Sequence, residues 1–409
     1  MTDERGATAS HGLIKLMTFL MFMMFAMTTD AVGVIIPEII RTYGLDLKAA
    51  GAFHYATMSG IALSALFLGF LADSLGRKAT IVLGLAVFAG AALAFGVTRE
   101  FPVFVGLLFV SGVAIGLFKT GALALIGDIS GSTREHTSAM NAVEGFFGLG
   151  AIIGPAIVAA LLAGGIAWKW LYVIAGGLCL ALMVAALAVR YPTARWAREK
   201  VTVRALAGAV RDPHLLGFSA AIMLYVGVET AIYVWMPTLL AGYAGPGAAL
   251  VPAALPMFFV LRAGGRFFGA WLLARMDWTA VLAVCTGGIL ACFGGALIGG
   301  KGVAALLLPL SGLFMSVLYP TLNSKGISGF PKAEHGAAAG MILFFTCVSA
   351  VLSPLAMGVV SDVFGDPAFG FGLACVFAAA LATGAVWNWR TNPAAGRLAL
   401  QDQTRGAGG

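Results

Sequence analysis

The sequence predicts an all-α polytopic membrane protein, and its composition, its apolar runs and their patterning lead to this fold class. Of the 409 residues, 60% are hydrophobic and only 11% are charged, whereas soluble domains carry about 25% charged residues. Apolar runs of about 20 residues recur from Leu13 to Trp389, each long enough to cross a hydrocarbon layer of about 30 Å. The runs lack the alternation of a membrane β-barrel, so helices must satisfy the backbone in lipid.

The sequence contains twelve apolar segments that are predicted to span the membrane. Because twelve is an even number, both chain ends are expected on the same side. The first segment is too long for a signal peptide, and no small-residue cleavage site follows it, so we interpret it as a retained helix. The predicted spans are residues 13–39, 51–72, 79–97, 102–126, 138–163, 169–189, 214–241, 249–273, 278–298, 303–325, 335–360 and 368–388.

The basic residues are distributed unevenly between the two sides of these spans. Of the 25 lysines and arginines, 17 lie on the side of the chain ends and five on the opposite side. Because cytoplasmic loops are enriched in positive charge, both termini are expected in the cytoplasm and the chain in the cell (inner) membrane. This topology explains the net charge of +7, so the lipid bilayer is the expected partner and nucleic acid is not.

A polar stretch from Arg190 to Asp212 divides the chain near its middle. We predict an N-terminal six-helix bundle at 1–189, a cytoplasmic linker at 190–213, a C-terminal six-helix bundle at 214–389 and a cytoplasmic tail at 390–409. A weak repeat supports the two halves, since Gly-Leu-Phe at 116–118 recurs at 312–314, and Ile-Ser-Gly at 129–131 recurs at 327–329. Each helix of the first half therefore has a counterpart six helices later.

A charged, glycine-containing loop joins the second and third spans and reads GFLADSLGRK at residues 69–78. Glycine suits a tight turn in which helices approach closely or the backbone takes unusual angles. Asp73 is expected to accept hydrogen bonds from the exposed N–H groups at the N-terminus of a neighbouring helix. Arg77 is expected to reach Asp128, which lies at the cytoplasmic end of the fourth span.

This loop resembles the GxxxD-x-x-G-R-K motif of the major facilitator superfamily. It departs at Ser74, where a basic residue is common, and the equivalent loop of the second half carries Leu273 at the acidic position. The resemblance implies two pseudo-symmetric bundles that rock around a mid-membrane site, in a protein that works as a monomer. It also implies that the loop latches the outward-facing state. The residues assigned to this cytoplasmic latch are Gly69, Asp73, Gly76, Arg77, Lys78 and Asp128.

Three further segments resemble the fucose permease family of proton-coupled sugar symporters. They are YVGVET at 225–230, FMSVLYPT at 314–321, and NAVE at 141–144 with the Gly-Leu-Gly that follows it. The resemblance implies symport of a sugar with a proton. Two positions depart from the family. Lys119 stands where these permeases carry an acidic residue in the fourth span, and Asp30 lies about one turn before the position of their first-span acid.

Five ionisable residues lie deep inside the predicted spans, namely Asp30, Lys119, Glu144, Glu229 and Arg262. Each costs about 2.5–3.5 kcal/mol at the bilayer centre, so they are expected to face a water-filled cavity or one another. A carboxylate can pair with a cation while another cycles its proton. We predict Asp30 or Glu229 as the proton carrier and Lys119–Glu144 as an ion pair, with Glu144 as a further proton-coupling residue.

The eighth span carries two arginines one turn apart. Arg262 is assigned, like Lys119, to an ion pair or to the binding of an anionic substrate, with a bond to a backbone carbonyl or snorkelling as the alternative. Arg266 is expected to snorkel towards the cytoplasm. Tyr225, Glu229 and Tyr233 stand at i, i+4 and i+8 in the seventh span, so they are predicted to share one helix face. Aromatic and polar side chains are predicted to line the substrate cavity, although aromatic residues also suit plain helix packing. These cavity residues are Tyr225, Tyr233, Trp235, Phe118, Asn141, Tyr319 and Asn323, with Phe146 and Phe147 as further stacking faces.

The predicted function is secondary active transport of a small polar solute, a sugar or polyol, by proton-coupled symport with alternating access. The proton is the coupling ion, and no cofactor or metal is expected. Two alternatives stay open, namely proton-antiport efflux of a drug or metabolite, and uptake of an organic anion. The sequence contains no metalloprotease motif, nucleophile elbow, acidic metal cluster or phosphate-binding loop, so no enzymatic activity is expected.

Overall fold

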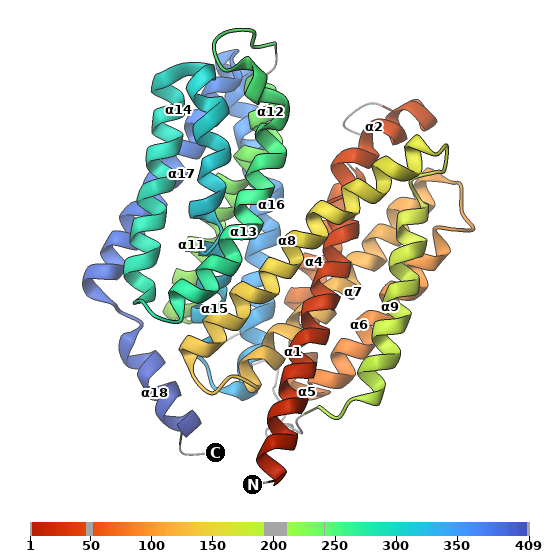
Figure 1. Cartoon of the computed structure of the whole chain (residues 1–409), viewed down its shortest axis with the longest axis vertical. Helices are drawn as coiled ribbons and strands as arrows, with labels where there is room; N and C mark the ends of the chain where they lie inside the picture. Colours follow the sequence, from red (N-terminus) through yellow and green to blue (C-terminus); the bar gives the residue numbers. More distant parts are fainter. Residues whose placement is uncertain (1, 46–51, 192–210, 241, 407–409) are drawn as a thin grey trace. The chain divides into compact units, whose positions relative to one another are not determined.

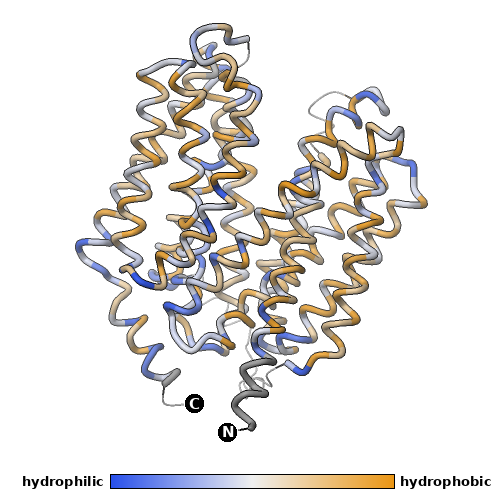
Figure 2. Tube along the Cα trace, viewed as in Figure 1, coloured by the Kyte–Doolittle hydropathy of each residue, from blue (hydrophilic) through white to orange (hydrophobic). Residues whose placement is uncertain are grey.

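The computed structural model describes residues 2–45, 52–191, 211–240 and 242–406, and these residues form helices joined by turns (Figure 1). Within them, ten helical segments are long and apolar enough to cross a membrane, and Ala52–Leu68 is a shorter apolar helix. One of the ten, Trp278–Ser328, carries both the ninth and the tenth predicted spans. The predicted polytopic all-α fold is therefore confirmed. Hydrophobic residues extend along the helices, while many hydrophilic residues gather at the turns (Figure 2).

The first half of the chain contains six predicted spans and one short connecting helix. Its helices are α1 (Thr2–Thr29), α2 (Val32–Tyr43), α4 (Ala52–Leu68), α5 (Leu71–Ser74), α6 (Arg77–Ala94), α7 (Phe101–Asp128), α8 (Thr133–Ala163) and α9 (Trp170–Ala188). The second half follows the same order of spans. Its helices are α11 (Pro213–Thr230), the π-helix η2 (Ala231–Trp235), α12 (Met236–Leu240), the 3-10 helix η3 (Ala248–Leu250), α13 (Val251–Leu273), α14 (Trp278–Met315), α15 (Leu318–Ser328), the 3-10 helix η4 (Lys332–Glu334), α16 (His335–Phe364), α17 (Pro367–Thr391) and α18 (Ala395–Gly406).

Three of the predicted spans differ from the prediction, since the first is interrupted and the ninth and tenth are joined. The first span breaks between α1 and α2, where Thr28 and Thr29 turn their hydroxyl groups back to the carbonyl of Phe25 at 2.9 and 3.3 Å. Such back-bonding competes with the helix ladder and favours a bend. The ninth and tenth spans are joined within α14 at Gly300, whose φ of 71° is accessible mainly to glycine.

Residues 192–210, most of the predicted linker, lie outside the described residues. The predicted tail contains a helix, α18, which follows α17 after a short turn at Asn392.

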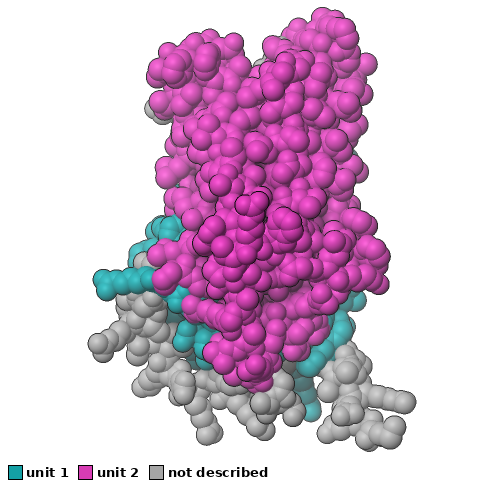
Figure 3. All heavy atoms as spheres, turned by 90° about the vertical axis from the view of Figure 1, so that its left-hand side faces the viewer, with its two compact units in different colours: residues 1–130, 146–212, 330–347 teal, residues 131–145, 213–329, 348–409 magenta. Residues whose placement is uncertain are grey.

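The helices gather into two compact units, which are coloured in Figure 3. Unit 1 comprises residues 1–130, 146–212 and 330–347, and unit 2 comprises residues 131–145, 213–329 and 348–409. Both long helices α8 and α16 contribute to the two units, with the boundaries after Gly145 and after Cys347. Each unit therefore contains helices from both halves of the sequence.

Small residues allow close helix packing inside unit 1. A Cβ atom added to Gly150 of α8 would lie 2.0 Å from the carbonyl oxygen of Met23 on α1, and one added to Gly154 would lie 2.0 Å from that of Met27. No side chain larger than hydrogen fits at such a distance. Membrane helices commonly associate through small residues of this kind. The close contact of α1 with α8 thus depends on the glycines of the fifth span.

Candidate functional site

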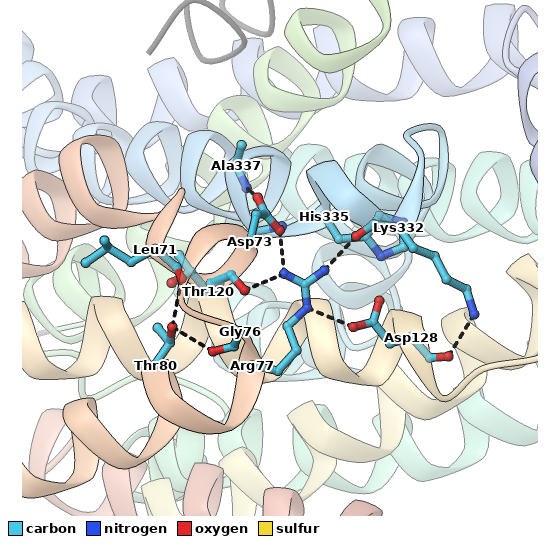
Figure 4. A network of polar contacts seen from close by, with 12 residues as sticks. Leu71, Asp73, Gly76, Arg77, Thr80, Thr120, Asp128, Lys332, His335 and Ala337 are labelled. Atoms are coloured by element: carbon cyan, nitrogen blue, oxygen red, sulfur yellow. Dashed lines mark hydrogen bonds and ion pairs between the residues drawn. The ribbon is translucent and has the colours of Figure 1, made fainter. Parts of the chain in front are cut away.

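Arg77 lies buried at the centre of a polar network in unit 1, at the first residue of α6 (Figure 4). Its Nε donates to Asp128 Oδ2 at 2.8 Å, as predicted. Its Nη1 donates to the carbonyl oxygen of Ala72 at 2.8 Å and to the carboxylate of Asp73. Its Nη2 donates to the carbonyl oxygen of Lys332 at 2.6 Å. One guanidinium group therefore connects the α5–α6 turn, the end of α7 and the segment that leads into α16.

Asp73 caps the N-terminus of α16 within the same unit. Its Oδ1 accepts the N–H of Gly336 at 2.9 Å, and its Oδ2 accepts the N–H of Ala337 at 2.8 Å. The predicted contact with a neighbouring helix N-terminus is therefore confirmed, and the helix dipole favours the negative charge there. Burial raises the pKa of Asp73 above its ordinary value, and Arg77 and the two N–H groups act against this rise.

The other residues of the 69–78 loop shape its turn and fix its end. Gly76 has a φ of 90°, which only glycine adopts readily. A Cβ atom on Gly69 would lie 3.1 Å from the Cα of Gly340 on α16, so this glycine permits close approach of the loop to α16. Lys78 donates to the carbonyl oxygens of Leu187 and Val189 at 2.8 and 2.9 Å, which satisfies the C-terminus of α9.

Replacing Arg77 by lysine is expected to weaken this network although the positive charge is kept. A lysine ammonium cannot reproduce the planar fork that reaches several acceptors in different directions. We expect a loss of roughly 2 kcal/mol in the free energy of unfolding, because at least one buried acceptor loses its donor. Chemical or thermal unfolding in detergent measures it. The matched control is Arg99→Lys in an exposed turn, and an equal effect of both changes would contradict the prediction.

In unit 2, Glu229 joins an ion pair and a hydrogen bond. Its Oε1 lies 2.7 Å from Nη2 of Arg262 on α13 and accepts the hydroxyl of Tyr225 at 2.7 Å. Glu229 is 8% exposed. Tyr225 and Glu229 share a face of α11, as their spacing predicted. The ion pair that was one of the roles predicted for Arg262 is therefore present, and its partner is Glu229 of α11.

Glu144 is paired with Arg266, also inside unit 2. Nη2 of Arg266 lies 3.3 Å from Glu144 Oε2, and its Nη1 donates to the main-chain oxygen of Glu144 at 2.7 Å. Arg266 is 1% exposed, so the predicted snorkelling of this side chain is wrong. The predicted pair of Lys119 with Glu144 is therefore wrong, and Arg266 is the partner of Glu144. The reason is that residues 131–145 of α8 pack in the same unit as α13, which periodicity alone does not reveal.

The spacing of the two arginines was the signal that could have led to both ion pairs. Arg262 and Arg266 lie four residues apart on α13, so their side chains leave one face of the helix. Two arginines on one face of a membrane-spanning helix require acceptors, because an uncompensated charge inside the membrane is costly. Glu229 and Glu144 are the acceptors that unit 2 supplies.

Lys119 of α7 lies among aromatic rings in unit 1. Its Nζ stands 4.5 Å from the centroid of the Phe147 ring and 5.7 Å from that of Phe22. Within the described parts of the chain, no carboxylate oxygen lies within 4.0 Å of this ammonium group. Phe118 is fully buried and packs against Phe22 and Phe25, with centroid distances of 5.2 and 4.6 Å. The aromatic rings attract the Lys119 ammonium group but carry no opposite charge, so its positive charge stays available to an anionic ligand.

The remaining predicted residues occupy different parts of the two units. Asp30 lies at the break between α1 and α2, and its Oδ2 accepts the hydroxyl of Thr29 at 2.8 Å. Phe146 stacks on Phe19 with centroids 5.1 Å apart. In unit 2, Asn141 donates from Nδ2 to the hydroxyl of Thr321 at 3.4 Å.

Tyr233 and Trp235 lie in the π-helix η2, which begins two residues after Glu229. A π-helical turn changes the angular spacing of side chains, so the predicted alignment of Tyr233 with Tyr225 no longer follows from α-helical periodicity. Tyr319 lies beside Tyr225, with ring centroids 6.4 Å apart, and Asn323 is buried on α15. Unit 2 therefore brings the seventh, eighth and tenth spans together around Glu229.

The chain is similar to several transporters of known name. The L-fucose-proton symporter of Escherichia coli is 24% identical, with 88% of this chain and 90% of that protein covered. The gallate transporter of Pseudomonas putida is 24% identical, with 92% and 90% covered. The solved structure of a transporter, FucP, in the outward conformation has a TM-score of 0.79 at 21% identity and covers 92% of this chain and 99% of that chain. These similarities extend over nearly the whole chain.

The motif loop, the twelve apolar spans and the structural similarity are all consistent with one family. A family model described as Major Facilitator Superfamily matches residues 18–354. The match includes the 69–78 loop, both buried ion pairs and Lys119. The chain therefore belongs to the major facilitator superfamily, whose members are membrane transporters and not enzymes.

Proposed function

We propose that this transporter is a proton-coupled symporter of a small polar solute, with a sugar or polyol as the favoured substrate. The observation that carries the proposal is the group of the buried Tyr225 and Glu229 with the half-buried Arg262, in which a single carboxylate oxygen meets both a hydroxyl and a guanidinium at 2.7 Å. Similarity to the L-fucose-proton symporter supports the substrate class. We place both termini in the cytoplasm of a cell (inner) membrane, on the distribution of basic residues, and we propose a monomer.

Glu229 is the proton carrier in this proposal. The ionised carboxylate is held by Arg262, and protonation removes the charge that holds the two side chains together. A neutral Glu229 can then donate a hydrogen bond, while Arg262 becomes available to another acceptor. Binding of a proton therefore changes the hydrogen-bonding groups that unit 2 offers to a polar solute. Asp30 is the second carboxylate proposed for proton coupling, and Glu144 is held as a stable partner of Arg266.

Uptake of labelled solute by liposomes containing the purified protein tests the proposal. An inward proton gradient should drive accumulation of a sugar or polyol above the external concentration, and an uncoupler should abolish this accumulation. Accumulation that is indifferent to the proton gradient would contradict proton coupling. Accumulation of organic acids in place of sugars would contradict the substrate class.

Uptake of an organic anion is the second candidate, and Lys119 is the observation that favours it. Its ammonium group faces the Phe147 and Phe22 rings, a setting that suits a flat anion which stacks on an aromatic face. The similarity to the gallate transporter agrees with this reading. Arg262 is less suited to bind the anion than the sequence analysis expected, because Glu229 already neutralises it.

Replacing Lys119 by methionine distinguishes the two substrate classes. If the substrate is an anion, the change should weaken its binding by roughly tenfold or more, because a charge-assisted contact is lost. If the substrate is a sugar, uptake should change only a few-fold. The measurement is the solute concentration at half-maximal uptake, compared with Lys169→Met. Lys169 bonds the carbonyl oxygens of Gly96 and Thr98 at a helix end, so it controls for loss of a lysine.

A further inference from the structure

The C-terminal helix α18 holds the beginning of α8 inside unit 2. Oδ1 of Asp402 accepts the N–H of Thr133 at 2.8 Å, and its Oδ2 accepts the hydroxyl of Thr133 at 3.0 Å. Thr133 is the first residue of α8, and it is buried. Its N–H belongs to the first turn of the helix, where no partner within the helix exists. A carboxylate from a distant helix satisfies this group and lies at the positive end of the helix dipole.

A second polar contact fixes α18 to the end of the tenth span. Nε of Arg397 donates to the carbonyl oxygen of Gly329 at 2.6 Å, and Gly329 directly follows α15. The apolar face of α18 is also covered, since Leu398 is buried. Asp402 thus holds the helix at α8, Arg397 holds it at α15, and Leu398 between these two residues in the sequence is buried.

The same combination of groups occurs at the motif loop of unit 1. There Asp73 accepts the first N–H groups of α16, and Arg77 donates to the carbonyl oxygen of Lys332 just before that helix. The helices that receive the two carboxylates, α8 and α16, are the fifth spans of the two halves. In each unit, therefore, an aspartate caps the N-terminus of one of these equivalent helices, and an arginine donates a hydrogen bond to a nearby main-chain carbonyl.

The loop of the second half that corresponds to residues 69–78 does not supply this cap. It carries Leu273 at the position equivalent to Asp73. Its remaining acid, Asp277, caps its own helix α14, because its Oδ1 accepts the N–H groups of Thr279 and Ala280 at 2.9 and 3.2 Å. The acid that caps α8 comes from α18 instead, more than 120 residues further along the chain.

We propose that Asp402 is the second-half counterpart of Asp73 and that α18 is a latch for α8. The beginning of α8 lies against α15, where Thr137 and Ser324 share a hydrogen bond of 3.0 Å and His136 bonds Ser328 at 2.6 Å. As the cap of α8, Asp402 favours the conformation in which these contacts are made. The transport cycle must release the cap when α8 separates from α15. Asp402 is a positioning residue, and its role is independent of the transported solute.

Hydrogen–deuterium exchange of the full chain in lipid nanodiscs tests this latch without any substrate. In Asp402→Asn, the amides at the start of α8, residues 133–137, should exchange roughly tenfold or more faster, because a charge-assisted bond is lost. Amides 335–340 at the start of α16 should be unaffected. Asp73→Asn should give the reverse pattern. The matched control is Gln403→Ala, an exposed neighbour on α18 that should change neither segment.

A second readout separates a latch from a cap that is merely structural. A cysteine placed at Ser324, a buried position, reports separation of α8 from α15 through its rate of labelling by a polar maleimide, corrected for the five native cysteines. Asp402→Asn should accelerate labelling several-fold, and Asp402→Glu should restore most of the wild-type rate. Unchanged exchange and labelling in Asp402→Asn, or the same changes in Gln403→Ala, would overturn the proposal. If Asp402→Asn removed the exchange protection of all of α8 and Asp402→Glu did not restore it, Asp402 would have a folding role only, and the proposed latch would be overturned.

Discussion

Replacing Glu229 by glutamine is expected to abolish proton-driven accumulation of solute while solute exchange across the membrane continues. A carboxamide keeps the shape of the side chain and the acceptor for Tyr225, but it cannot take up and release a proton. At 100 mV, coupling to one proton provides about 2.3 kcal/mol, so the accumulation ratio should fall roughly fiftyfold. The measurement compares net uptake with counterflow in liposomes.

The matched control for this change is Glu38→Gln in α2. Glu38 also forms an ion pair with an arginine, Arg41, at 2.7 Å, but the arginine is exposed. Exposed ion pairs contribute little, so Glu38→Gln should leave accumulation unchanged. Full accumulation in Glu229→Gln would show that another group carries the proton, and Asp30→Asn would then become the decisive variant.

Replacing Arg266 by methionine is expected to be the most destabilising single change considered for this chain. Methionine fills much of the volume, but Glu144 is then left buried without its cationic partner. Removing one member of a buried ion pair costs about 3–5 kcal/mol in the free energy of unfolding. Denaturant unfolding in detergent measures the loss. The double variant Arg266→Met with Glu144→Met should recover most of it, because two apolar side chains need no charge compensation.

Arg275→Met serves as the matched control at the end of the same helical segment. Arg275 is exposed and stands over the ring of Trp271, 4.4 Å from its centroid. Loss of such an exposed cation–π contact costs about 0.5–1 kcal/mol. Equal destabilisation by both single changes, or no recovery in the double variant, would mean that the buried pair of Arg266 and Glu144 does not dominate at this site.

The local parts of the structure could be predicted from the sequence because short-range chemistry determines them. The twelve spans follow from apolar segment length, and the contacts of Asp73 and Arg77 follow from the needs of a tight turn between helix ends. Tyr225 and Glu229 share a face because their spacing matches one turn of an α-helix. In each case the relevant groups are close in sequence, or one of them is a helix terminus that must find a partner.

The partners of the buried charges could not be predicted in the same way. Periodicity shows which face of α8 carries Glu144, but it does not show that this end of α8 packs with α13. The pairing with Arg266 is decided by that tertiary arrangement. Similarly, nothing near Asp402 in the sequence indicates that it caps a helix beginning at Thr133. The break at Asp30 depends on competing hydrogen bonds of Thr28 and Thr29, which hydropathy does not report.

Proton movement driven by the substrate itself tests proton-coupled symport most directly. Liposomes containing the purified protein and a pH-sensitive dye receive sugars, polyols or organic acids one at a time, without an imposed pH gradient. We predict that a sugar or polyol acidifies the lumen with the wild-type protein and not with Glu229→Gln. A response to organic acids alone would assign Lys119 to an anionic substrate. No acidification by any solute, together with proton-driven export of a drug from the same liposomes, would contradict symport and identify an exporter.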